Sequence, residues 1–157
     1  MIWPFRRKSK KRMARILINE PITSSTRVSV LKALKQIEDR EFPALIVRID
    51  SPGGTVGDSQ EIYSAIKRLK DKGCKVIASF GNISASGGVY IGVASDKIVA
   101  NPGTITGSIG VIIRGNNLSE LLDKIGIKFE TVKSGVFKDI LSPDKPLSEE
   151  GRGLLQG

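Results

Sequence analysis

Short apolar runs alternate with longer amphipathic stretches along most of this chain of 157 residues. Three of the runs have the length and the branched residues of strands, at 14–19, 44–49 and 75–80. We expect the second and third runs to be buried on both faces of a sheet. The stretches between the runs repeat apolar residues at helical spacing, one from Thr26 to about Arg40 and one marked by Ile62, Ile66 and Leu69. This succession predicts an α/β fold with a mainly parallel sheet flanked by helices.

The same patterns continue toward the C-terminus. They predict a short helix through Val93, strands at 97–100, 110–114 and 128–133, and a helix that ends at Gly126. Ser148 can cap a last helix, but only Leu154 and Leu155 offer it an apolar face, so we expect this segment to be poorly ordered. We divide the chain into an arm, residues 1–12, and one core domain, residues 13–157, which we expect to be incomplete at its C-terminal end.

The composition excludes several kinds of catalytic site. Histidine is absent, and Cys74 is the one cysteine. These two facts exclude Ser-His-Asp and Cys-His catalysis, histidine metal ligands, an internal disulfide and a CxxC pair. We expect Cys74 to be a buried, inert thiol, and we expect no metal and no cofactor. If the chain is an enzyme, its base must therefore be a lysine, a carboxylate or a tyrosine.

The first 15 residues hold seven Lys and Arg side chains and no acidic one, although the whole chain has a formal net charge of +9. Three interpretations stay open: a solvated tail, attachment to an anionic membrane surface with help from Ile2, Trp3 and Phe5, and, least favoured, nucleic-acid binding. No apolar segment follows the cations as in a signal peptide, and no stretch reaches the roughly 18 apolar residues of a membrane span. We expect a chain on the cytoplasmic side that is soluble or peripherally membrane-associated.

Two glycine-rich turns follow predicted strands, "SPGG" at 51–54 and "SASGG" at 84–88. Open α/β sheets place their sites at the carboxyl ends of strands. Neither turn has the Walker or GxGxxG pattern, which disfavours nucleotide binding. Both offer backbone N–H groups without bulky side chains, as an oxyanion hole requires. Ser86, with Gly87 directly after it, is either a nucleophile beside such a hole or part of an ordinary turn.

Four blocks of the sequence occur in the order and spacing of a known family: "RIDSPGGTVGDSQEIYSAI", "SFGNISASGGVYI", "IVANPGTITGSIGV" and "VKSGVFKDILSP". They resemble the signal peptide peptidase A family of serine proteases, whose members look like Clp proteases and crotonases in fold. The resemblance implies that Ser86 is the nucleophile and Lys138 the general base. It also implies oxyanion N–H groups from Gly54 and Gly87. Main-chain bonds to an extended peptide are expected from Gly107, Ser108 and Ile109.

The acidic residues beside these motifs have other expected roles. We expect the carboxylate of Asp139 to point away from Lys138, and we expect Asp50 and Asp58 to serve the turn and the helix cap around "SPGG".

The resemblance implies a serine endopeptidase with a Ser/Lys dyad that cleaves signal peptides or other membrane-associated peptides by acyl transfer. Its partners would be peptide substrates and, in the full-length form, further copies of the chain. A catalytically silent fragment or scaffold of the same fold is the alternative. An acyl-CoA enzyme of the crotonase type is a third interpretation, because those enzymes use paired oxyanion N–H groups without a Ser/Lys dyad.

Overall fold

The computed structural model describes residues 12–156. It separates into two compact units, Met1–Val111 and Ile112–Gly157. The predicted basic arm, apart from Arg12, lies outside the described residues. The predicted single core domain is therefore described below as two units.

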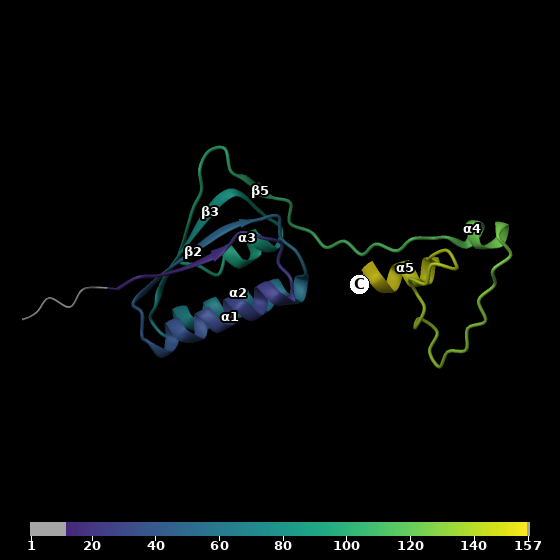
Figure 1. Cartoon of the computed structure of the whole chain (residues 1–157), viewed down its shortest axis with the longest axis horizontal. Helices are drawn as coiled ribbons and strands as arrows, with labels where there is room; N and C mark the ends of the chain where they lie inside the picture. The colour runs from purple at the N-terminus through teal and green to yellow at the C-terminus, as the bar shows by residue number, and fades with distance from the viewer. Residues whose placement is uncertain (1–11, 157) are drawn as a thin grey trace, which may run out of the picture. The chain divides into compact units, whose positions relative to one another are not determined.

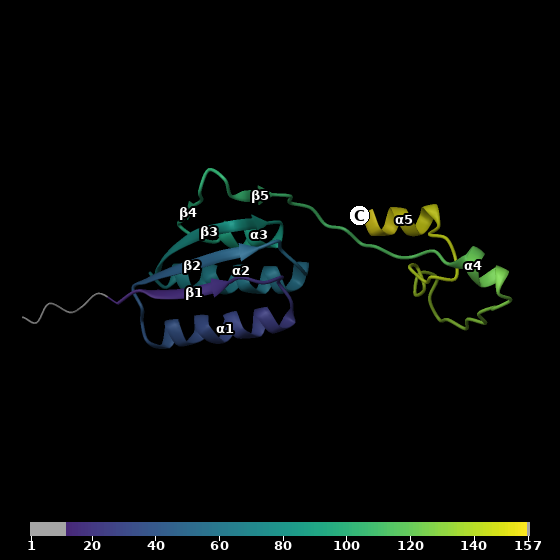
Figure 2. The same cartoon turned by 45° about the horizontal axis from the view of Figure 1, so that its top comes forward.

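The first unit is built on a parallel sheet (Figures 1 and 2). Its elements in chain order are β1 (Ala14–Ile18), α1 (Ser24–Asp39), β2 (Ala44–Ser51), α2 (Val56–Asp71), β3 (Lys75–Ala85), α3 (Gly87–Gly92), β4 (Lys97–Val99) and β5 (Ile105–Gly107). The strands lie in the order β1-β2-β3-β4, and β5 also pairs with β3, beyond β4 along the same edge. Every strand pair is parallel, which confirms the α/β prediction.

The core lies on one face of this sheet, where α1, α2 and α3 pack (Figure 2). It combines alternate strand residues with the apolar helix stripes, namely Ile16, Ile18, Leu45, Val47, Ile49, Val76, Ala78, Phe80, Val30, Leu34, Ile37, Ile62, Ile66 and Leu69. The alternate residues of β2 (Ala44, Ile46, Arg48 and Asp50) are only half-buried, and Ile77 of β3 is exposed. The prediction that β2 and β3 are buried on both faces is therefore wrong within the described chain, because all three helices cover the same side.

Helix α1 begins earlier than the sequence pattern suggested. Thr23 is the N-cap, and its backbone N–H donates to Thr26 Oγ1 at 3.4 Å. Thr26 itself is buried in the first turn, where its hydroxyl donates to the carbonyl of Pro21 at 2.9 Å. The predicted cap at Thr26 is thus wrong by one turn, because that hydroxyl serves the loop before the helix.

The second unit contains α4 (Ser119–Lys124) and α5 (Glu149–Gln156). Gly126 follows α4 with φ +74°, as predicted for the residue that ends this helix. The strands predicted at 110–114 and 128–133 are wrong: both segments are exposed and lack strand structure. A strand needs a neighbour for its backbone hydrogen bonds, and the described chain provides none for these segments.

The last segment is more ordered than expected. Ser148 Oγ accepts the backbone N–H of Gly151 at 3.0 Å at the start of α5, so the predicted capping role of Ser148 is confirmed. Gly151 is buried, and a Cβ on it would lie 2.9 Å from Ile140 Cγ1. The expectation of poor order is wrong because this cap and this contact hold the helix within its own unit. Within residues 12–156, no helix combines the length and apolarity that crossing a bilayer requires.

Candidate active site

Ser86 lies where β3 passes into α3, at the carboxyl end of the sheet. Strand β3 continues to Ala85, beyond the run 75–80 that the sequence pattern marked, so the first part of "SASGG" is strand. Ser84 pairs with Ser51 of β2 on one side and with Thr106 of β5 on the other. The glycine-rich turn therefore starts at Ser86 itself.

The backbone of Ser86 is strained. Its φ is +50° and its ψ is −116°, a combination that residues with a side chain rarely adopt. The Ser86 N–H donates to the carbonyl of Gly107 at 2.8 Å, and its carbonyl accepts the N–H of Tyr90 at 3.0 Å. Among residues 12–156, the Ser86 hydroxyl has no hydrogen-bond partner. A sharp, strained strand-to-helix turn of this kind presents the nucleophilic serine in α/β-hydrolases.

The "SPGG" turn packs directly against Ser86 and Gly87. A Cβ on Gly53, whose φ is +97°, would lie 2.8 Å from Gly87 N and 2.9 Å from Ser86 Cβ. A Cβ on Gly87 would in turn lie 3.4 Å from Gly54 N. The two turns therefore meet backbone to backbone, and this approach requires glycine.

The amides of Gly54 and Gly87 lie at this contact. The groups around them are occupied: Ile22 N–H donates to Gly53 O at 2.9 Å, and Thr55 N–H donates to Ile22 O at 3.0 Å. Within the described part of the chain, neither the Gly54 N–H nor the Gly87 N–H donates a hydrogen bond. Two free N–H groups beside a serine hydroxyl are the elements from which an oxyanion hole is made.

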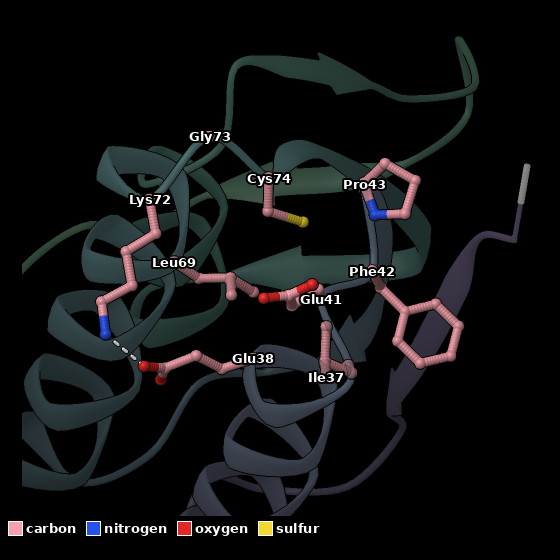
Figure 3. Close-up of a pocket in the computed structure, with 9 residues that line it drawn as sticks. All are labelled: Ile37, Glu38, Glu41, Phe42, Pro43, Leu69, Lys72, Gly73 and Cys74. Atoms are coloured by element: carbon pink, nitrogen blue, oxygen red, sulfur yellow. Dashed lines mark hydrogen bonds and ion pairs between the residues drawn. The ribbon is translucent and has the colours of Figure 1, made fainter.

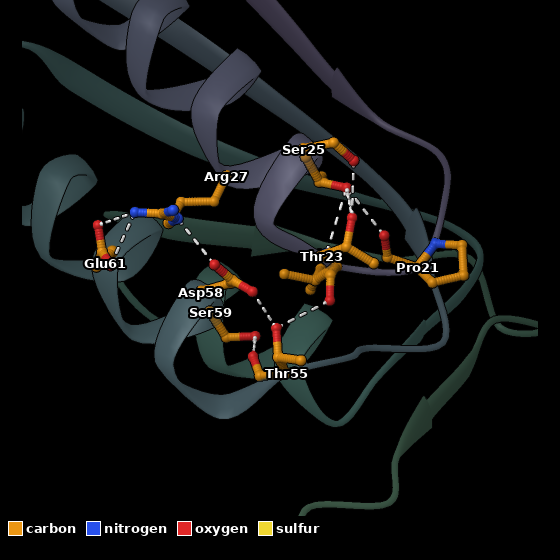
Figure 4. A network of polar contacts seen from close by, with 10 residues as sticks. Pro21, Thr23, Ser25, Arg27, Thr55, Asp58, Ser59 and Glu61 are labelled. Atoms are coloured by element: carbon orange, nitrogen blue, oxygen red, sulfur yellow. Dashed lines mark hydrogen bonds and ion pairs between the residues drawn. The ribbon is translucent and has the colours of Figure 1, made fainter.

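A polar network fixes the start of α2 and with it the "SPGG" turn (Figure 4). Arg27 of α1 pairs with Asp58 at 2.8 Å and with Glu61 at 2.9 Å. The Thr55 hydroxyl contacts Asp58 and donates to Ile22 O at 3.2 Å. The hydrogen bonds that Arg27 donates to Glu61 raise the pKa of Arg27. Asp58 thus has a structural role, but through its ion pair with Arg27 and its contact with the Thr55 hydroxyl; no side-chain cap hydrogen bond forms at the described start of α2, so the expected cap role is not confirmed. Arg27 and Thr55 were not predicted, because their partners depend on how the two helices pack.

Strand β5 places the predicted substrate-binding residues at the same end of the sheet. Gly107 pairs with Ala85, and its carbonyl accepts the Ser86 N–H. Gly107 and Ser108 both have positive φ, +83° and +50°, so the chain turns immediately after the strand. Ile109 follows with 73% of its surface exposed. These positions lie beside the serine turn, but peptide binding by them stays a prediction.

Lys138 belongs to the second unit, whereas Ser86 belongs to the first. It lies in a series of turns, with its N–H 3.4 Å from Gly135 O, and it is exposed. The Ser86–Lys138 pairing therefore stays a prediction.

The neighbouring Asp139 has other partners than Lys138. Its carboxylate pairs with Lys133 at 2.7 Å and with Lys145, and these contacts lower the pKa of Asp139 to about 2. The expectation that Asp139 points away from Lys138 is confirmed. Turns rather than strand alternation bring this about.

Cys74 directly precedes β3, at the opposite end of that strand from Ser86. A cavity of about 420 Å³ is lined there by Ile37, Glu38, Glu41, Phe42, Pro43, Leu69, Lys72, Gly73 and Cys74 (Figure 3). Cys74 is buried, as predicted, and burial raises the pKa of its thiol. None of the predicted site residues lines this cavity, so it is separate from the serine turn.

Comparison with known proteins agrees with this geometry. The sequence model of peptidase family S49 matches residues 68–157. A Synechocystis sp. protein named as a putative protease is 60% identical over 156 residues, which are 99% of this chain and 56% of that protein. A protein of Enterococcus faecium named as a putative signal peptide peptidase is 43% identical over 127 residues, 80% of this chain and 37% of its own.

Solved structures give the fold. A membrane protease of Pyrococcus horikoshii, specific for a stomatin homolog, has a TM-score of 0.53 at 28% identity over 61% of this chain and 48% of its own. ClpP1 of Listeria monocytogenes has a TM-score of 0.53 at 26% identity over 57% of this chain and 52% of its own. The fold is Clp-protease-like, and because the family model spans more than half of the sequence, the chain belongs to peptidase family S49.

Proposed function

We propose that this chain carries the catalytic residues of a serine endopeptidase with a Ser86/Lys138 dyad. One observation supports this above all: Ser86 has a strained backbone and a free hydroxyl, beside two N–H groups, of Gly54 and Gly87, that have no partner within residues 12–156. Strain of this kind persists only where surrounding contacts hold it, and it gathers at functional sites.

The proposed reaction is acyl transfer to Ser86. Neutral Lys138 takes the hydroxyl proton as Ser86 Oγ bonds to the peptide carbonyl carbon, and Gly54 and Gly87 N–H stabilise the oxyanion. The carbon–nitrogen bond then breaks, and Lys138 gives the proton to the leaving amine. Water, losing a proton to Lys138, attacks the ester, and the proton returns to Ser86 as the acid product leaves.

The proposed substrates are signal peptides or other membrane-associated peptides in extended conformation. Main-chain groups of Gly107, Ser108 and Ile109 would bind them as an added strand. Because Gly107 O already accepts the Ser86 N–H, the positions after it offer the freer groups. The names of two relatives, a signal peptide peptidase and a stomatin-specific membrane protease, support this substrate class.

The proposal includes two kinds of assembly. The full-length protein would be a homo-oligomer, in which Lys138 acts on Ser86 of the same or a neighbouring subunit. Large apolar side chains are exposed along 109–132, among them Ile109, Val111, Ile112 and Val132. Their exposure supports burial of this segment in an interface between subunits of the proposed oligomer. The basic arm would attach the protein to an anionic membrane surface.

A catalytically silent scaffold is the alternative, favoured by the exposure of Lys138. A fluorophosphonate probe and a peptide substrate separate the two. In the protease, the probe labels Ser86, and Ser86→Ala abolishes labelling and cleavage, whereas Ser29→Ala on the exposed side of α1 leaves both unchanged.

The base is tested in the same assays. Lys138→Ala lowers cleavage by about a thousandfold or more, since the serine loses its general base. The exposed Lys128→Ala is the matched control and keeps full turnover. Absence of labelling in the unaltered protein supports the scaffold, and full turnover in Lys138→Ala refutes the dyad.

A further inference from the structure

The last part of β3 contains a bulge directly before the serine turn. Ile49 of β2 pairs with Phe80 of β3, and the next pair is Ser51 with Ser84. One residue of β2, Asp50, therefore lies opposite three residues of β3, at 81–83. The extra residues lose their regular ladder partners, and they set how far β3 extends toward Ser86.

The carboxylate of Asp50 accepts hydrogen bonds from backbone N–H groups of this bulge. Its Oδ1 accepts the N–H of Ile83 at 3.0 Å, and hydrogen bonds from the N–H groups of Ile83 and Asn82 lower the pKa of Asp50. Gly81 is buried and makes room for the side chain, because a Cβ on it would lie 2.4 Å from Asp50 Cγ. The carboxylate and the bulge thus fit each other at van der Waals contact.

Two further side chains hold the carbonyl groups of the same segment. Thr104 Oγ1 donates to Gly81 O at 2.8 Å from the β5 side. Arg48 Nη1 donates to Phe80 O at 2.8 Å from the β2 side. Three side chains therefore fix the backbone of 80–83, three residues before Ser86.

We propose that Asp50 is a positioning residue for Ser86 and for the N–H of Gly87. This inference rests on the proposed function. Asp50 directly precedes the "SPGG" turn, and its carboxylate binds the segment that ends three residues before Ser86. One side chain therefore links the two turns whose backbones meet at Gly53 and Gly87. Neither turn can shift along the sheet relative to the other without breaking the hydrogen bonds between Asp50 and the backbone of β3.

Asp50→Asn tests the inference with little change of shape. The amide is neutral and its NH₂ cannot accept, so the side chain holds the N–H groups of the bulge more weakly than the carboxylate does. Asp39→Asn is the matched control, because Asp39 is exposed and, among residues 12–156, pairs only with Lys35 on the same helix, at 2.8 Å. Thr104→Val, which removes the hydrogen bond to the carbonyl of Gly81, is the second variant.

Three quantities are measured on the whole chain: the rate of fluorophosphonate labelling of Ser86, kcat and KM for a peptide, and hydrogen exchange of the Ser86 N–H. We expect Asp50→Asn to slow labelling and lower kcat by about tenfold to a hundredfold, because misplaced oxyanion donors stabilise the transition state less. KM should change little, and exchange of the Ser86 N–H should speed up. Asp39→Asn should match the unaltered protein in all three.

The outcomes separate the inference from the function. If the unaltered chain is labelled and Asp50→Asn is labelled equally fast, Asp50 is not a positioning residue, although the protease proposal stands. If the unaltered chain is not labelled, the protease proposal fails, and exchange of the Ser86 N–H alone decides: faster exchange in Asp50→Asn supports positioning of this backbone, and unchanged exchange refutes it. If Asp50→Asn does not fold, Thr104→Val replaces it under the same criteria.

Discussion

Gly54 stands where no larger residue fits, which makes it a sensitive test of the serine turn. A Cβ there would lie 2.0 Å from Ile22 O, an oxygen that already accepts the Thr55 N–H at 3.0 Å. We expect Gly54→Ala to lower the free energy of unfolding by about 1–3 kcal/mol, because backbone must move to admit the methyl group. Urea denaturation measures this effect.

Gly57 provides the matched control at the residue scale. It lies in the first turn of α2, and a Cβ on it would meet nothing within 4 Å. Gly57→Ala should raise the free energy of unfolding by about 0.5–1 kcal/mol, since alanine loses less backbone entropy in a helix. If both variants unfolded at the same urea concentration, the close approach at Gly54 would be disproved.

At the scale of elements, Asp139 organises the turns of the second unit through Lys133 and Lys145. Its pKa is lowered from an ordinary 3.8 to about 2, so its ion pairs contribute fully above pH 3.8 and are lost as the pH falls from there through about 2. The carboxyl ¹³C signal of Asp139 should therefore titrate near 2. In the unaltered protein, the free energy of unfolding should fall between pH 3.8 and about 2 as Asp139 is protonated. The Asp139→Asn variant should lack this fall. Titration of Asp139 near 3.8 would contradict the ion-pair geometry.

The regular elements of the first unit could be predicted because their apolar residues recur with the period of the structure they form. Strands β1, β2 and β3 and helices α1 and α2 follow such patterns. The runs 110–114 and 128–133 are equally apolar, but a strand also needs a neighbour, and pairing cannot be read from one run. The β3 extension through Gly81 and Asn82 was missed for the same reason: the Asp50 carboxylate and the pairing with β5 decide it.

The candidate site also contains a part that the sequence predicted and a part that it did not. Ser86 and the glycine turns stand out as motifs, so their place at the strand ends was predictable. The hydrogen bonds of Asp50, Thr104 and Arg48 depend on a register with two extra residues, which no local pattern specifies. The sequence could therefore indicate the proposed reacting groups and not the side chains proposed to position them.

At the scale of the whole molecule, positive charge is concentrated at one end of the chain. Seven Lys and Arg residues lie in the first 15, against a net charge of +9 for all 157. We expect the chain to sediment with vesicles that contain anionic lipid and to be released by salt, because each cation near such a surface contributes about 1 kcal/mol and screening acts beyond about 10 Å at 0.1 M. Replacing the five cations at 6–8 and 10–11 with Gln should abolish binding.

Exposed lysines elsewhere serve as the control for this prediction. Lys32→Gln and Lys97→Gln change the net charge outside the arm and should leave vesicle binding nearly intact. Equal binding to neutral and anionic vesicles would refute the electrostatic attachment. Binding to DNA with similar affinity would show a non-specific polycation instead.

The contact between the two glycine turns also determines when a reactive centre can form during biosynthesis. Ile22 holds the first turn, that turn packs against Gly87, and Gly107 holds Ser86, so the arrangement is complete only when the whole segment 22–107 is present. A nascent chain that ends before β5 lacks the carbonyl that fixes the strained serine. Non-local contacts of this kind form later than local ones, because each requires the closure of a loop. The paired amides are therefore a property of the completed sheet, and a partly synthesised or locally unfolded chain does not display them.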